Sequence, residues 1–171
     1  MIAIRHILVP TDFSEPADAA LTYAKGLAAQ FGSELHLLHV VATPQVAWAT
    51  ESAAFSWPTL LADLETEAKT QLERQIPEGD PLAGRVTLST SIGTPVEQIL
   101  EYAAAHRIDL IVMGTHGRGL VGHMFLGSVA ERVVRRASMP VLTVHGVGQA
   151  STAEKVTDAT AEESTKAAVS R

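Results

Sequence analysis

Residues 4–41 read IRHILVPTDFSEPADAALTYAKGLAAQFGSELHLLHVV, and no other part of the chain is as informative about its fold class. Two short apolar runs, 4–9 and 34–41, flank a segment in which apolar residues recur every three or four positions. The runs have the length and composition of strands, and the segment between them has the period of an amphipathic helix. A strand, a helix and a second strand form a βαβ unit, so the stretch predicts an α/β fold with parallel strands.

The predicted helix in this unit has a start signal, an apolar face and a stop signal. Ser14 is a residue type that caps helices, and Gly32 follows the last apolar position, as glycine does after many helices. We expect one buried face, formed by Ala17, Ala20, Leu21, Ala24, Leu27, Ala28 and Phe31.

The same alternation continues along the chain and predicts five strands and four helices in a single domain. Further strands are expected at 85–91, 110–113 and 140–145, and a last helix at 128–137. A second helix is expected to bury Leu61, Leu64, Ala68, Leu72 and Ile76. The third helix starts at a capping box from Thr94 to Glu97, with Pro95 at its first position.

Composition limits the class of protein. A chain of 171 residues with 46% hydrophobic and 19% charged residues is long enough to bury one core. Its net charge of −6 argues against binding to nucleic acid, and no apolar run reaches the roughly 20 residues that span a membrane. The first ten residues lack the core of a signal peptide, and the chain has no cysteine, so we expect a cytoplasmic protein without disulfides or thiol chemistry.

Residues 1–146 contain every predicted strand and helix and are expected to form the domain. Residues 147–171 have no aromatic side chain, and their apolar residues are only Ala and Val among Ser, Thr, Glu and Lys. Such a segment buries too little apolar surface to offset its conformational entropy. We therefore predict a disordered polar tail.

Glycines are concentrated between the fourth strand and the last helix. Five of the twelve glycines lie within residues 114–127, and Ser128 follows them. A glycine-rich loop ahead of a helix can turn several backbone N–H groups toward one point, where the helix dipole adds positive potential. His116 and Arg118 could add charged contacts, so the loop predicts a phosphate site. The alternative is an ordinary surface loop, with Ser128 and Glu131 forming a second capping box.

Other nucleotide motifs do not fit the loop. No G-x-x-x-x-G-K-[ST] pattern occurs, which excludes a Walker-type loop. Residues 117–122 match G-x-G-x-x-G, but no acidic residue follows at the distance that a dinucleotide fingerprint needs. We interpret that match as accidental.

The spacing of Gly114, Gly117, Gly127 and Ser128 fits G-x2-G-x9-G-[ST], the pattern of the ATP-binding universal stress proteins, which this chain resembles. The resemblance extends to residues 7–14 (ILVPTDFS), to 37–40 (LLHV) and to 139–141 (MPV), and it covers about residues 3–145. It implies a Rossmann-like, open five-stranded parallel sheet of order 3-2-1-4-5 with helices on both faces. It also implies a homodimer that pairs through the last strand, residues 141–145.

The resemblance further implies ATP as the ligand, with a divalent metal such as Mg²⁺ bound through the phosphates. Asp12 would then accept hydrogen bonds from the ribose, and Val40 would meet the adenine through its backbone. The full set of residues carried over by position is Pro10 and Thr11 at the base, Asp12, Val40, and, around the phosphates, Met113, Gly114, His116, Gly117, Arg118, Gly119, Gly127, Ser128 and Val129.

Several residues have a simpler interpretation. Asp12 follows a strand and precedes a helix, where an Asp often only supports the turn. His36 and His39 are three positions apart on one strand and point to opposite faces, which excludes a metal shared by these two. We expect His6 and His106 at the surface, and no metal bound by protein ligands. Trp48, Phe55 and Trp57 fall in the connection 42–58, where they cover the base, meet a partner or pack on the domain.

The sequence therefore predicts an ATP-binding regulatory or stress-response protein with slow hydrolysis at most, because no general base is evident near the predicted phosphates. Two alternatives remain open. One is an interaction module of the same fold that binds no nucleotide, and the other is a slow ATPase. The last strand has no internal charge to protect its edge, so we expect it to pair with a second copy unless the tail covers it.

Overall fold

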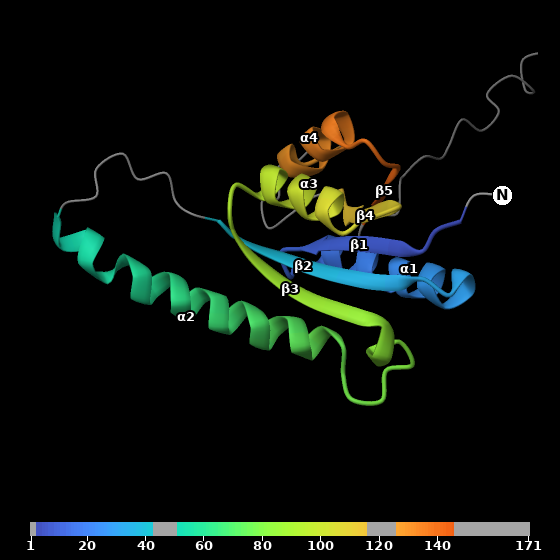
Figure 1. Ribbon diagram of the computed structural model, residues 1–171, viewed down its shortest axis with the longest axis horizontal. Coiled ribbons are helices and arrows are strands. Elements are labelled where there is room, and N and C mark those ends of the chain that lie inside the picture. The colour runs from blue at the N-terminus through green and yellow to red at the C-terminus, as the bar shows by residue number, and fades with distance from the viewer. Residues whose placement is uncertain (1–2, 43–50, 116–125, 146–171) are drawn as a thin grey trace, which may run out of the picture.

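The computed structural model describes residues 3–42, 51–115 and 126–145, and for residues 51–57 it describes the backbone alone (Figure 1). The elements in chain order are β1 His6–Thr11, α1 Glu15–Phe31, β2 Glu34–Ala42, α2 Glu51–Gln75, the 3-10 turn η1 Ala83–Arg85, β3 Val86–Gly93, α3 Pro95–Ala105, β4 Leu110–Gly114, α4 Ser128–Arg136 and β5 Val141–Val144.

The five strands form one parallel sheet of order β3-β2-β1-β4-β5, which confirms the predicted topology. Residue His6 of β1 lies beside Glu34 of β2, and Thr11 lies beside His39. On its other side β1 pairs with β4, where Ile7 lies beside Leu110. The strand order reverses at β1, so the chain leaves β1 and β4 in opposite directions and a crevice opens at their carboxyl ends.

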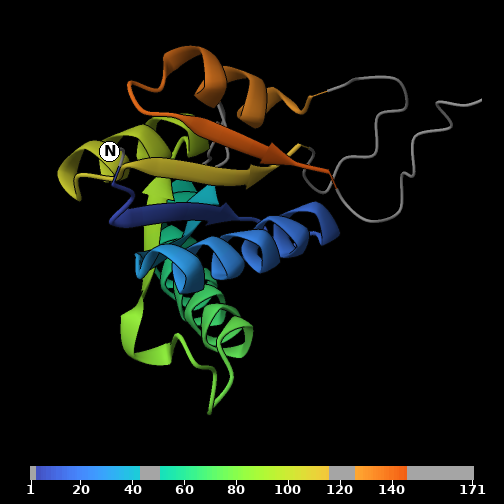
Figure 2. The ribbon, with the colours of Figure 1, turned by 90° about the vertical axis from the view of Figure 1, so that its right-hand side faces the viewer.

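Helices cover both faces of the sheet (Figures 1 and 2). One core packs α1 and Leu72 of α2 against β-strand residues such as Ile7 and Leu35. The other packs α3 and α4 against residues such as Leu8 and Ile111. Neighbouring residues of one strand thus serve opposite cores, which explains why the central strands are continuously apolar.

Helix α1 follows its predicted limits but not its whole predicted face. Gly32 ends the helix in the left-handed region at φ 70°, and its N–H donates to the Ala28 carbonyl. Phe31 was expected to be buried and is 52% exposed, so this prediction was wrong. Phe31 is the last residue of α1, and none of the described elements covers it there. Ser14 occupies the N-cap position, but its side chain makes no capping hydrogen bond.

Helix α2 is longer than predicted. It begins at Glu51 and includes Pro58, so the second half of the expected 42–58 connection is helical. Pro58 is the eighth residue of α2 and so lies past the first turn, where proline removes one backbone hydrogen bond of the helix. Leu64 is exposed to solvent, whereas Ala68 and Leu72 are buried as expected. Trp48 and the side chains of Phe55 and Trp57 lie outside the described residues.

The capping boxes predicted for α3 and α4 are not formed. Thr94 is the N-cap of α3, but its side chain makes no capping hydrogen bond. Gly127 is the N-cap of α4, so Ser128 is already the first helical residue and lies one position too late for the predicted box. The strand limits also shift by one or two residues, which places Pro10 and Thr11 inside β1. Among the described residues, the structure has no helix long and apolar enough to cross a membrane.

Candidate functional site

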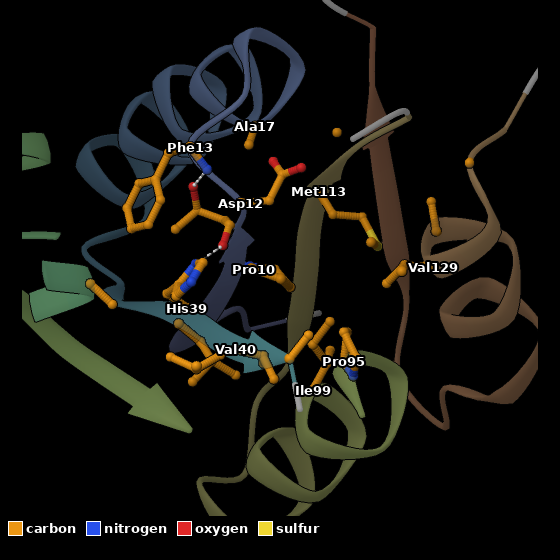
Figure 3. A pocket seen from close by; sticks show the side chains of 18 of the residues that line it. Pro10, Asp12, Phe13, Ala17, His39, Val40, Pro95, Ile99, Met113 and Val129 are labelled. Atoms are coloured by element: carbon orange, nitrogen blue, oxygen red, sulfur yellow. Dashed lines mark hydrogen bonds between the residues drawn. The ribbon is translucent and has the colours of Figure 1, made fainter. Parts of the chain in front are cut away.

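A cavity of about 750 Å³ opens at the carboxyl ends of the strands, at the point where the strand order reverses (Figure 3). Its volume lies within the range of small-molecule sites, roughly 300 to 1,000 Å³. The ends of β1, β2 and β4 form the floor, and the first turns of α3 and α4 contribute to the walls. The sheet therefore has a ligand-sized hollow where open α/β sheets place their ligands.

Nine of the thirteen residues predicted for the site line this cavity: Pro10, Thr11, Asp12, Val40, Met113, Gly114, Gly127, Ser128 and Val129. They come from four separate segments, and the fold brings all four to one place. The other four, His116, Gly117, Arg118 and Gly119, lie outside the described residues.

The turn after β1 is fastened by its own side chains. The Phe13 N–H donates to Thr11 Oγ1 at 3.0 Å, and Phe13 adopts φ 60°, a conformation that side chains other than glycine seldom take. Asp12 Oδ1 accepts from the Ser14 N–H at 3.2 Å and from the Ser14 hydroxyl at 2.5 Å. Asp12 thus supports the turn, as its simpler interpretation expects, and it lies beside Met113 at the edge of the cavity (Figure 3).

His39 is a cavity residue that the sequence argument assigned no role. Its Nδ1 lies 2.8 Å from the Thr11 carbonyl oxygen, so the proton on Nδ1 donates to that carbonyl. The ring also stacks on Phe13, with centroids 4.6 Å apart and an interplanar angle of 27°. These contacts join the ends of β1 and β2 on one side of the cavity. The position of His39 at the end of a buried strand was the signal that could have identified it.

The two ends of the glycine-rich loop meet at the cavity. The Gly127 N–H donates to the Thr115 carbonyl at 2.6 Å, and the Thr115 N–H donates to the Val144 carbonyl at 2.9 Å. Thr115 is buried, and Ser128 is exposed at the start of α4. The N-terminus of α4, with its positive end of the helix dipole, is therefore fixed beside the end of β4.

Gly114 is required for packing as well as for any ligand. A Cβ atom on Gly114 would lie 2.7 Å from the Pro16 carbonyl carbon and 2.8 Å from its oxygen. Backbone atoms cannot yield as a flexible side chain can, so the end of β4 and the start of α1 tolerate only glycine at this distance. The glycine pattern predicts only that Gly114 lets the backbone approach phosphates; the contact with Pro16 follows from the packing of α1 against β4.

Helices α2 and α3 supply walls that the sequence argument did not predict. Leu64, Glu67 and Gln71 of α2 face the cavity, and the Gln71 amide donates to Glu67 Oε1 at 2.9 Å. Pro95 and Ile99 of α3 close the side near Val40 (Figure 3). Leu64, Glu67 and Gln71 are three and four positions apart, so they lie on one face of a helix. The sequence alone does not show that this face lines a cavity.

The described lining contains the acidic residues Asp12 and Glu67 and the imidazole of His39, and it contains no Lys or Arg. Within this lining, an anionic group therefore finds its positive potential at the amides of α4 rather than at side chains. The apolar residues near Val40 suit a flat ring system. The cavity thus has an apolar end and an end with backbone donors.

Together the fold and the cavity define an α/β protein with an open parallel sheet and a cavity at its topological switch point. A model of the universal stress protein family matches residues 3–145. The chain therefore belongs to the universal stress protein family.

Relatives and solved structures agree with this assignment. Universal stress protein MJ0577 of Methanocaldococcus jannaschii is 32% identical over 155 residues, which cover 84% of this chain and 96% of the relative. A universal stress protein of Thermus aquaticus is 37% identical over 138 residues, covering 81% of this chain and 96% of the relative.

The solved structure of MJ0577 has a TM-score of 0.75 at 33% identity and covers 84% of this chain and 97% of that chain. Universal stress protein UspA of Lactobacillus plantarum has a TM-score of 0.68 at 28% identity, with coverage of 84% of this chain and 99% of that chain. The similarity thus extends over nearly the whole of each solved chain.

Proposed function

We propose that this universal stress protein binds ATP and that the nucleotide regulates its surface or its dimer. One observation supports this most strongly: a cavity of about 750 Å³ at the switch point, bordered by the two ends of a loop whose sequence fits G-x2-G-x9-G-[ST]. The cavity has a dimension suited to a nucleotide, and the loop has a composition suited to phosphates.

Each end of the cavity suits one part of ATP. The adenine is expected beside Val40, Pro10 and Thr11, where the lining is apolar and backbone groups are near. The ribose is expected at Asp12, whose carboxylate can accept from hydroxyl groups. The phosphates are expected at the amides of Gly127 to Val129 and beside Met113 and Gly114, with further contacts predicted from the sequence of residues 116–119.

A divalent cation such as Mg²⁺ would bind through the phosphates, because Mg²⁺ commonly takes few protein ligands at a nucleotide site. It would neutralise part of the phosphate charge when bound. We expect hydrolysis to be slow at most, because the described residues predicted to hold the phosphates, Met113, Gly114 and Gly127 to Val129, offer hydrogen-bond donors but no general base.

The experiment first identifies any nucleotide that copurifies with the protein. Calorimetry then measures the affinity for added ATP, and a time course over hours measures its hydrolysis. Bound ATP with little loss supports the proposal. If no nucleotide copurifies and added ATP shows no measurable affinity, the protein is the non-binding interaction module. Turnover near one per second would identify an enzyme.

A variant in the predicted loop tests the assignment of the phosphates. Gly117→Val places a branched side chain where the backbone is expected to approach the phosphates, so ATP binding should be lost. The circular dichroism spectrum should stay that of the parent. ATP affinity equal to that of the parent would show that this loop does not hold the nucleotide.

We also propose a homodimer that pairs through β5. This strand is an edge of the sheet, since β4 is its neighbour on one side and no described strand lies on the other. An unpaired edge strand favours pairing with another chain. The location of the protein in the cytoplasm and the disorder of residues 147–171 stay predictions from the sequence.

A further inference from the structure

A group of titratable side chains lies at the amino ends of β1 and β2, opposite to the nucleotide cavity. His6, Glu34 and His36 each present one ligand atom, and these three atoms all lie within 4.8 Å of one another. Glu34 is directly beside His6 across the two strands, and His36 is two positions after Glu34, so the three side chains share one face of the sheet.

Two ring nitrogens in this group lack hydrogen bonds. His6 Nδ1 and His36 Nε2 are both buried, and neither has a hydrogen-bond partner among the described residues. His36 as a whole is only 7% exposed. A buried polar atom without a partner is costly in a native protein, and a bound ion is one of its recognised explanations.

The other nitrogen of His36 is held in place. His36 Nδ1 lies 3.1 Å from the Tyr102 hydroxyl oxygen, which in turn lies 2.9 Å from Ser89 Oγ. With the proton of the neutral ring on Nδ1 and donated to Tyr102, the lone pair of Nε2 is left available as a ligand. A hydrogen bond from the second ring nitrogen is the usual way in which a protein orients a metal-binding histidine.

The distance between His6 and Glu34 also suits a small cation. His6 Nδ1 lies 3.5 Å from Glu34 Oε2. Two ligands of one tetrahedral Zn²⁺ ion lie about 3.4 Å apart when each is about 2.1 Å from the metal. The Glu34 side chain is 61% exposed and has room to rotate toward the two imidazoles.

We propose that His6, Glu34 and His36 form a binding site for a divalent transition-metal ion, with Zn²⁺ as the preferred occupant. Two imidazole nitrogens and one carboxylate oxygen, with no thiolate, form a donor set that Zn²⁺ accepts, and water completes the coordination. The site joins β1 to β2 at the end of the sheet remote from the cavity. His6 and Thr11 are five residues apart on β1, about 16 Å at strand spacing.

The spacing of residues along one strand does not predict this site. The exclusion of a metal between His36 and His39 compared residues on opposite faces of β2. The residues that could share a metal with His36 are His6 on β1 and Glu34 at the start of β2. Only the register of the two strands shows that these three side chains lie together. His106, expected at the surface, is indeed exposed and stacks on Tyr102 at a centroid distance of 3.8 Å.

The test titrates Zn²⁺ into the full chain, without an affinity tag, after treatment with EDTA, and follows the heat of binding and the thermal midpoint. We expect one Zn²⁺ per chain and a higher thermal midpoint, because an ion that binds only the folded state stabilises it. Mg²⁺ at the same concentration should produce neither effect. Co²⁺ should bind in place of Zn²⁺ and give the visible absorption of a four-coordinate site.

Variants separate this site from adventitious binding. Glu34→Gln changes an exposed side chain and should preserve the fold while weakening Zn²⁺ binding at least tenfold. His6→Gln should have a similar effect, and Tyr102→Phe should weaken binding tenfold or more without changing the stoichiometry, since it removes only the orienting hydroxyl. His145→Gln alters an exposed histidine outside the group and should bind as the parent does.

Absence of Zn²⁺ binding at 100-fold molar excess would overturn the proposal, as would equal affinities of the parent and the Glu34→Gln and His6→Gln variants. The metal titration needs no nucleotide, so its result is independent of whether the cavity binds ATP.

Discussion

Gly114 shows how one residue can serve both the packing and the candidate site. It lines the cavity, and a Cβ at this position would lie 2.7 Å from the backbone of Pro16. A substitution here therefore disturbs the contact between β4 and α1 whether or not a ligand is bound. Loss of ATP binding in a Gly114 variant would say little about phosphate contacts unless stability were measured as well.

Gly114→Ala is expected to lower the free energy of unfolding of the nucleotide-free protein by about 1 to 3 kcal/mol, the usual range for an overpacked contact. Urea denaturation measures it. Gly26→Ala is the matched control: Gly26 is a helical residue of α1 whose added Cβ meets nothing within 4 Å. That variant should be as stable as the parent or up to about 1 kcal/mol more stable. Equal stability of Gly114→Ala and the parent would contradict the packing argument.

Ser128 permits a test in which stability and affinity change in opposite directions. Ser128→Asp puts a carboxylate at the first residue of α4, where the helix dipole stabilises it by about 0.3 to 1 kcal/mol. The same charge repels phosphate, so calorimetry should show ATP affinity falling at least tenfold. Ser128→Ala, which loses one hydrogen bond to a phosphate oxygen but adds no charge, should lower affinity less than Ser128→Asp does. Undiminished affinity in Ser128→Asp would place the phosphates elsewhere.

At the scale of elements, long-range polar contacts fasten helices and loops to the sheet. Asp109, in the turn before β4, accepts from the N–H groups of Arg5 and His6 at 2.7 and 3.0 Å and so holds the start of β1. Lys25 of α1 donates to Asp80 at 2.8 Å and to the Gln75 carbonyl at 3.0 Å. These contacts join segments that are far apart in the chain, so they act on the packing of whole elements.

The contact between Lys25 and Asp80 predicts a pH dependence of stability. The hydrogen bond from Lys25, followed by that from the Leu82 N–H, lowers the pKa of Asp80 below its ordinary value of 3.8. The folded state therefore holds this proton less tightly than the unfolded state. The contribution of Asp80 is complete above pH 3.8 and is lost as the pH falls through the lowered pKa of the folded state.

Asp80→Asn should accordingly be about 1 kcal/mol less stable than the parent near neutral pH, and the difference should shrink in acid. Urea denaturation between about pH 6 and pH 3 measures it. Asp63→Asn removes an exposed carboxylate of α2 and is the control, with a small difference from the parent at neutral pH. A gap between Asp80→Asn and the parent that widened in acid would show that the sign is wrong.

At the scale of the whole molecule, β5 is the edge through which we expect two copies to pair. Pro140 and Val144 accept hydrogen bonds from the N–H groups of Ile111 and Thr115, so they face β4. In a parallel strand alternate residues direct their backbone groups to the same side. Val141 and Thr143 therefore direct theirs away from the sheet, toward any partner.

Thr143→Pro removes an outward N–H without removing a hydrogen bond to β4, so the monomer should fold while strand pairing between copies is lost. Sedimentation velocity at micromolar concentration should show a monomer for Thr143→Pro and a dimer for both the parent and Thr143→Val, which keeps the N–H. A dimer that persists in Thr143→Pro would exclude β5 as the interface, and a monomeric parent would exclude the dimer itself.

The sequence by itself determined the kinds of element and much of the candidate site. Short apolar runs and helical spacing are local properties, and they sufficed to predict five parallel strands and the end of α1 at Gly32. The glycine content of residues 114–127 predicted the loop, and the family resemblance implied the other segments that line the cavity. The strand order came from the family resemblance, and the structure confirms it.

Only the tertiary structure decided which distant residues touch. The Gly114 contact with Pro16, the cavity wall from α2 and the grouping of His6, Glu34 and His36 depend on strand register and on how helices pack. The exposure of Phe31 has the same origin. A strand or helix period specifies the face of a residue within its own element, whereas its neighbours on other elements follow from the packing of the whole domain.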